Sequence, residues 1–239
     1  EATKYIERNK DSPFFLYLPH YAVHDPIEGR PDLVEKYRKK IVARTLYTGP
    51  PYVLEENPDA TSTHSRTELN ALLNDPRYKG FHALPGQMVK IKQYQDNAQF
   101  AAMVESMDES LGRIVSKLKE LKIEDKTIIV FVSDNGGMSA ANFGNPAKVI
   151  NPNALDKVFA TSNLPLRAGK GWFYEGGIRV PMIVKWPGQG RQGIESQVPV
   201  IGTDIFPTII DMLGLKLLPQ QHIDGKSLVP LVKGGQTLS

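Results

Sequence analysis

The sequence contains no cysteine, so disulfides are excluded, and it carries no Walker motif, zinc-binding motif or nucleophile elbow. It has no apolar run of the ~20 residues that a membrane-spanning helix requires. The excess of positive charge is small: the net charge is +3 and the basic residues are scattered, which gives no indication of nucleic-acid binding. The 239 residues are 41% hydrophobic, an ordinary globular composition that suits one domain or most of one large domain.

Segments typical of strands and helices alternate along the chain, and this order predicts an α/β fold. Strands are expected at residues 14–18, 127–132 and 179–186. Residues 127–132 are all β-branched or aromatic, which is the composition of a strand buried on both faces of a parallel sheet. We therefore expect a mixed, mostly parallel sheet with helices on both faces.

An apolar stripe with spacings of three and four residues predicts a long helix over residues 96–121. Shorter helices are expected at residues 1–10, 32–40 and 204–213. Thr203 is predicted to be the N-cap of the last of these, and Gly214 to end it.

Residues 45–92 are polar and rich in proline, asparagine and glycine, with one helical stretch near residues 65–74. We interpret this segment as a long surface excursion from the domain. Loops of that length often serve as functional lids, and a merely variable loop is the alternative.

The strand predicted at residues 127–132 is followed by Asp134, Asn135 and two glycines. In open α/β sheets, ligands bind just beyond the carboxyl ends of strands. The side-chain oxygens of Asp134 and Asn135 are the kind that Ca²⁺ and Mg²⁺ prefer, so this position is a candidate metal site. The alternative is a plain turn, because Asn-Gly is a favoured hairpin turn.

Two further segments carry candidate site residues. His24 follows the strand predicted at residues 14–18, in a loop closed by Asp25-Pro26. Lys170 lies between two glycines, where a backbone can bend closely around an anion. A lone loop histidine or lysine is usually a surface residue, but the combination with Asp134 at a strand end favours a single site.

The chain resembles the sulfatases, within the alkaline-phosphatase-like superfamily, on segments that cover nearly its whole length. In order, these are PFFLYLPHYAVHDP, AAMVESMDESLGRI, VSDNGG, PLRAGKGWFYEGGIRVPMIVKWPG, TDIFPTIIDMLG and IDGKSLVPLV. The resemblance implies an α/β domain of that superfamily and a sulfuric ester hydrolase of the arylsulfatase kind, which hydrolyses sulfate monoesters with the help of a metal. The implied substrates are sulfated carbohydrates.

The resemblance also implies roles for individual residues. Asp134 and Asn135 match metal ligands, with Ca²⁺ expected and Mg²⁺ as the alternative. His24 matches the histidine that contacts the sulfate and assists departure of the alcohol, and Lys170 matches the lysine that holds the sulfate oxygens. His20 and Trp172 lie close to the matched segments and are expected to contact the substrate, with a plain surface position as the alternative for His20. The excursion is expected to help shape the substrate pocket. The implied location is periplasmic or secreted.

Other family features are missing from this sequence. Sulfatases use a formylglycine made from Cys or Ser in a C-x-P-S-R or S-x-P-x-R motif, and the nearest match, at residues 163–167, has Asn163 at the nucleophile position. No pair of adjacent aspartates occurs, and the family's C-terminal subdomain has no counterpart after Leu231. We therefore expect the middle and later part of a sulfatase catalytic domain, inactive alone, whose partner is the N-terminal segment of the same protein.

Two alternatives to sulfatase activity stay open on the sequence. One is a phosphodiesterase or phosphonate hydrolase of the same superfamily, and the other is a non-catalytic partial domain that acts in binding or assembly. Two structural roles are also predicted. The acids Glu105, Asp108 and Glu109 of the long helix are expected to be solvated or structural rather than catalytic. Arg167 is expected to pair with Glu175 and shape the lysine loop.

Overall fold

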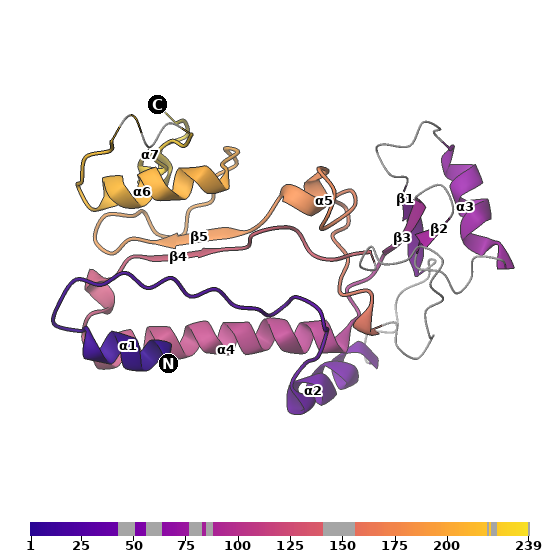
Figure 1. Ribbon diagram of the computed structural model, residues 1–239, viewed down its shortest axis with the longest axis horizontal. Coiled ribbons are helices and arrows are strands. Elements are labelled where there is room, and N and C mark those ends of the chain that lie inside the picture. Colours follow the sequence, from indigo (N-terminus) through magenta and orange to yellow (C-terminus); the bar gives the residue numbers. More distant parts are fainter. Residues whose placement is uncertain are drawn as a thin grey trace. The chain divides into compact units, whose positions relative to one another are not determined.

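A long helix, a three-stranded sheet and a separate pair of strands organise the part of the chain that the computed structural model describes (Figure 1). That part comprises residues 1–42, 51–55, 64–76, 83–84, 88–140, 156–218, 220 and 224–238. The chain divides into two compact units. The first consists of Glu1–Tyr5, Pro13–Ile114 and Asn135–Val180, and the second of Ile6–Ser12, Val115–Asp134 and Pro181–Ser239.

Helices and strands alternate, as predicted for an α/β protein. The helices are α1 (Ala2–Arg8), α2 (Pro31–Val42), α3 (Arg66–Asn74), α4 (Ala98–Glu120), α5 (Glu175–Ile178), α6 (Ile205–Met212) and α7 (Val229–Val232), with 3-10 turns η3 (Glu124–Lys126) and η5 (Gly202–Asp204). The strands are β1 (Tyr52–Glu55), β2 (Ala83–Leu84), β3 (Met88–Lys92), β4 (Ile129–Val132) and β5 (Met182–Lys185). Within the described ranges, no helix is both long and apolar enough to cross a bilayer.

Helix α4 begins where the side chain of Asn97 supplies hydrogen-bond acceptors for its first turn. Asn97 Oδ1 accepts the backbone N–H of Gln99 at 2.9 Å and of Phe100 at 3.1 Å, which satisfies two donors that have no partner inside the helix. The Asn97 amide in turn donates to the carbonyl oxygen of Phe159 at 3.0 Å. One buried asparagine therefore both starts the helix and ties it to a distant loop.

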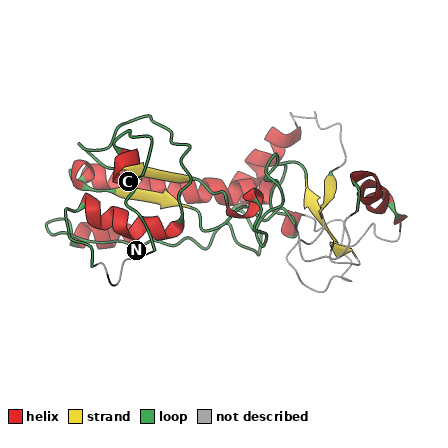
Figure 2. Ribbon diagram, turned by 90° about the horizontal axis from the view of Figure 1, so that it is seen from above, coloured by secondary structure: helices red, strands yellow, loops and turns green. Residues whose placement is uncertain are grey.

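In the first unit, β1, β3 and β2 form an antiparallel sheet with α3 against it (Figure 2). Leu54 of β1 is fully buried against Leu69 of α3. The helix predicted near residues 65–74 is confirmed, but the three strands around it were not predicted. The excursion predicted at residues 45–92 thus contains a small sheet with a core of its own.

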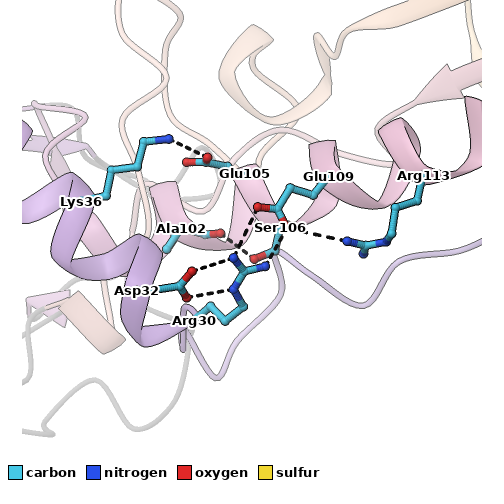
Figure 3. Close-up of polar contacts among 8 residues, drawn as sticks. All are labelled: Arg30, Asp32, Lys36, Ala102, Glu105, Ser106, Glu109 and Arg113. Carbon is cyan, nitrogen blue, oxygen red and sulfur yellow. Dashed lines mark hydrogen bonds and ion pairs between the residues drawn. The ribbon is translucent and has the colours of Figure 1, made fainter. Parts of the chain in front are cut away.

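Ion pairs and an apolar cluster fix α2 to α4, and Figure 3 shows the polar contacts. Lys36 Nζ lies 2.6 Å from Glu105 Oε1, and Arg30 bridges Asp32 at 2.7 Å and Glu109 at 2.6 Å. Hydrogen bonds from Arg30 lower the pKa of Asp32 to about 2. The structural role predicted for Glu105 and Glu109 is confirmed.

In the second unit, β4 pairs with β5 in antiparallel register, Val130 opposite Val184. Parallel neighbours were predicted for this strand, and none is among the described residues. The β-branched run indicates only that a strand tends to be buried, because direction depends on a partner far away in sequence. Burial is also partial, since the side chains of Val132 and Ile183 are 41% and 64% exposed.

Two local predictions were wrong. Residues 14–18 belong to no strand: Phe15 and Tyr17 are exposed, so the strand-like alternation is present without a partner strand among the described residues. Thr203 is not the N-cap of α6, because η5 precedes the helix and the Thr203 hydroxyl donates to the carbonyl oxygen of Asp224 at 3.1 Å. Gly214, with φ +66°, ends α6 as predicted.

Candidate functional site

The turn that follows β4 packs directly against the segment that contains α5. Because β4 pairs with β5, far along the chain, Asn135 and Gly136 are not a two-residue hairpin turn. The backbone N–H of Gly136 donates to the carbonyl oxygen of Gly177 at 2.8 Å. A Cβ on Gly136 would lie 1.9 Å from the carbonyl oxygen of Gly176, so only glycine permits this approach.

The lysine loop, residues 163–174, lies beside the same turn. The backbone N–H of Lys170 donates to the carbonyl oxygen of Gly137 at 3.1 Å. Gly171 has φ +95°, and a Cβ on Gly169 would lie 2.3 Å from Ser139 Oγ. The two glycines around Lys170 therefore have separate purposes, one for conformation and one for close packing.

Asn163, at the nucleophile position of the formylglycine-like match, has a structural role. Its side-chain amide donates to the carbonyl oxygens of Gly137, at 2.7 Å, and of Ala168, at 3.2 Å. Ala168 has φ +60°, an uncommon conformation for a residue with a side chain, and Ser139 Oγ also donates to its carbonyl oxygen, at 3.1 Å. Asn163 thus ties the lysine loop to the turn after β4.

An apolar cluster joins the histidine segment to the same turn. Ile27, Met103 and Ala160 are its buried members, and the half-buried residues packed against them include Val23 and Met138. Val23 precedes His24 in the chain and Met138 follows Gly137. The segments that carry His24, Asn135 and Lys170 are therefore packed on one another within the first unit.

His24 is oriented by its neighbour. Its Nδ1 lies 2.7 Å from Asp25 Oδ1, and the His24 side chain is 45% exposed. The hydrogen bond between Nδ1 and the backbone carbonyl oxygen of Asp25, at 3.0 Å, fixes the ring and leaves Nε2 on the opposite side. His20 lies four residues earlier in the chain, and its Nε2 is 3.0 Å from Ser110 Oγ on α4.

The potential ligands for a metal are few. Among the described residues, no group of three or more His, Asp or Glu side chains is arranged to hold an ion. Asp134 and Asn135 are adjacent in the chain and offer side-chain oxygens, whereas Ca²⁺ takes ~6–8 oxygen ligands. These two residues fit part of a calcium site and do not complete one.

One ion pair at the lysine loop was not predicted. Arg167 Nε lies 3.1 Å from Glu55 Oε2, and the guanidinium stacks 3.8 Å from the centre of the Tyr174 ring. Glu175, the predicted partner of Arg167, instead contacts Arg179 at 3.4 Å. Nothing in the sequence connects residues 55 and 167, so the pair emerges only from the fold.

Several known proteins are similar to this chain in sequence or structure. The Sulfatase family model matches residues 1–215. A sulfatase of Formosa agariphila is 30% identical over 95% of this chain and 31% of its own length, and human steryl-sulfatase is 37% identical over 55% and 21%. The crystal structure of Ps i-CgsB, 27% identical, superimposes with a TM-score of 0.62 over 98% of this chain and 37% of its own; it was also solved with k-i-k-neocarrahexaose.

The superposition confirms the predicted fold class, an incomplete domain of the alkaline-phosphatase-like kind. The chain spans about a third of the length of the relatives that it matches along nearly all of its own length. A family match that covers residues 1–215 of 239 leaves one conclusion: this chain belongs to the sulfatase family.

Proposed function

We propose that the protein to which residues 1–239 belong hydrolyses sulfate monoesters, and that this chain supplies the part of the site that stabilises negative charge. The observation that supports it is the packing of three segments on one another. The turn at Asn135, the loop of Lys170 and the segment of His24 are joined by backbone hydrogen bonds and by one apolar cluster. A site for a small anion requires such convergence.

Each candidate residue has a role that its chemistry suits. Lys170 is a point charge that binds sulfate oxygens. His24, oriented by Asp25 through Nδ1, donates a proton from Nε2 to the departing alcohol oxygen. His20 is proposed as a further contact for the substrate.

Asp134 and Asn135 are proposed as two ligands of a divalent cation, Ca²⁺ or alternatively Mg²⁺. Sulfatases use such a metal, which when bound polarises the sulfate oxygens, together with a formylglycine nucleophile. The 239 residues contain neither a cysteine nor an S-x-P-x-R motif. We therefore propose that this chain is inactive alone, and that its site is completed by an N-terminal segment of the same protein, periplasmic or secreted as the family resemblance implies.

The substrate class proposed is sulfated carbohydrate. Support comes from Ps i-CgsB, which aligns with 98% of this chain and was solved with a carbohydrate, k-i-k-neocarrahexaose. Human steryl-sulfatase aligns with only 55%. We propose that residues 1–239 are one partial catalytic domain whose excursion, residues 45–92, shapes the substrate pocket. Phosphonate hydrolysis and a non-catalytic role are less favoured, because the relatives that align by sequence over most of the chain have sulfatase names.

The test is a sulfatase assay on the full-length reading frame that encodes these residues. We expect release of sulfate from p-nitrophenyl sulfate and from sulfated oligosaccharides, and a loss of at least about a hundredfold in Lys170→Ala and in His24→Ala. Lys216→Ala, an exposed lysine of the second unit, is the matched control and should retain activity. Full activity in Lys170→Ala, or hydrolysis of phosphonate esters alone, contradicts the proposal.

A further inference from the structure

The three-stranded sheet of the excursion turns one face toward the lysine loop. In its register, Val53 lies opposite Ile91 and Glu55 opposite Val89, which places these four side chains on one face. This face packs on the lysine loop in a single cluster. Its buried members are Val89, Ile91, Ala140, Ala168 and Trp172, with Val53 and Tyr174 at its margin.

Glu55 is the charged residue on this otherwise apolar face, and only 9% of it is exposed. Its carboxylate accepts a hydrogen bond from Arg167 Nε at 3.1 Å. A buried carboxylate needs such a partner, because an uncompensated charge is costly in an apolar setting. The position of Glu55 thus determines where the Arg167 side chain lies.

Arg167 is held at both ends. Its carbonyl oxygen accepts the backbone N–H of Gly176 at 2.8 Å, while its side chain contacts Glu55 and stacks on Tyr174. The next residue, Ala168, has φ +60°, and an uncommon backbone conformation persists only where the surroundings hold it. Lys170 is three residues after Arg167, at the end of this constrained stretch.

From this geometry we propose that Glu55 is a positioning residue for Lys170. It acts through Arg167, so that the excursion sets the conformation of the loop that holds the sulfate. The inference rests on the proposed function of Lys170 and extends it, because it makes a residue of the excursion part of the anion site. The excursion then affects sulfate binding through the loop as well as substrate choice through the pocket.

Two measurements on the ¹⁵N-labelled 239-residue chain test the proposal. The first is amide hydrogen exchange at Lys170, whose N–H donates to Gly137. Loss of the charge-assisted bond in Glu55→Gln should raise the exchange rate there about tenfold, with β4 unaffected. The matched control is Glu175→Gln, which breaks the exposed pair with Arg179 and should leave Lys170 unchanged.

The second measurement is the affinity for inorganic sulfate, followed by chemical shifts at Lys170. Removing a carboxylate should by itself tighten binding of an anion, whereas loss of positioning should weaken it, so the sign separates the two roles. We expect Glu55→Gln to bind sulfate at least about threefold more weakly than the wild type. Arg167→Lys keeps the positive charge and loses the planar stacking group, so it should also weaken sulfate binding. If Glu55→Gln does not fold, Arg167→Lys is the variant that tests the proposal.

The outcomes separate the inference from the function on which it rests. If the wild-type chain shows no sulfate shifts at Lys170, the proposed role of Lys170 fails, and the exchange rates alone decide whether Glu55 positions the loop. If sulfate binds but Glu55→Gln changes neither exchange nor affinity, or tightens binding, the positioning role is refuted and the proposed function stands.

Discussion

Replacing Gly136 with alanine should detach the turn after β4 from the segment at Gly176. The new Cβ would lie 1.9 Å from the Gly176 carbonyl oxygen and 2.8 Å from its carbonyl carbon. Both are backbone atoms, so no side chain can rotate away, and the two segments must separate by about 1.5 Å to reach ordinary contact. That displacement also breaks the 2.8 Å hydrogen bond from Gly136 to Gly177.

The cost follows from these two effects. Overpacking of a close contact costs about 1–3 kcal/mol, and a lost backbone hydrogen bond adds about 0.5–1.5 kcal/mol. The first unit should therefore lose about 2–4 kcal/mol of unfolding free energy. With a urea dependence of about 2 kcal/mol per molar, its unfolding midpoint should fall by roughly 1–2 M.

Tryptophan fluorescence can follow the first unit alone. The sequence has two tryptophans, and in a Trp186→Phe background only Trp172 remains, a residue of the lysine loop that is buried in its apolar cluster. Gly112→Ala is the matched control, because nothing lies within 4 Å of its new Cβ on α4. It should be neutral or stabilise by up to about 1 kcal/mol. An equal midpoint for Gly136→Ala and the Gly112 control would refute the packing of the turn on the lysine loop.

Three further predictions concern stability. Burial raises the pKa of Tyr52 to about 12. The contribution of Tyr52 to the free energy of unfolding is therefore complete below pH ~10 and is lost as the pH rises toward 12. Between pH 9 and pH 11, urea titrations should show a smaller loss of stability for Tyr52→Phe than for the wild type. A hydrogen bond from Lys185 lowers the pKa of Glu124. The stability that this bond contributes is present above pH ~4.3 and is lost in acid. Wild type and Glu124→Gln should therefore differ in stability at pH 7, and the difference should shrink as the pH falls toward ~3. Ser65→Ala removes the capping box of α3 and should cost about 1 kcal/mol in denaturant unfolding, whereas the exposed Thr67→Ala should cost nothing.

The sequence predicted the helices well because their signal is local. The stripe of α4 recurs every three or four residues, and its amphipathic face needs no knowledge of the partner. Strands were harder to predict. Residues 14–18 alternate as a strand does without forming one, and β1 and β3 pair across more than thirty residues of polar sequence. Strand pairing depends on residues far apart in the chain, which periodicity does not show.

The candidate site likewise combines features that are local in the sequence with contacts that are not. The candidate residues, His24 and Lys170 among them, were proposed from motifs that lie within short segments. The contacts that join those segments were not, since the close approach of Gly136 to Gly176 and the pair of Glu55 with Arg167 link positions 40 and 112 residues apart. Each such contact requires the folded chain to bring its two partners together.

The proposed function requires His24, Lys170, Asp134 and Asn135 to serve one bound sulfate, the last two through its cation. The most direct measurement is a crystal structure of the full-length protein with Ca²⁺ and a bound sulfate monoester. We expect the sulfate to contact Lys170 Nζ and His24 Nε2, the cation to be bound by Asp134 and Asn135, and all four side chains to lie within about 10 Å of one another. A sulfate bound elsewhere, or His24 and Lys170 on opposite edges of the sheet from Asp134, would contradict the account.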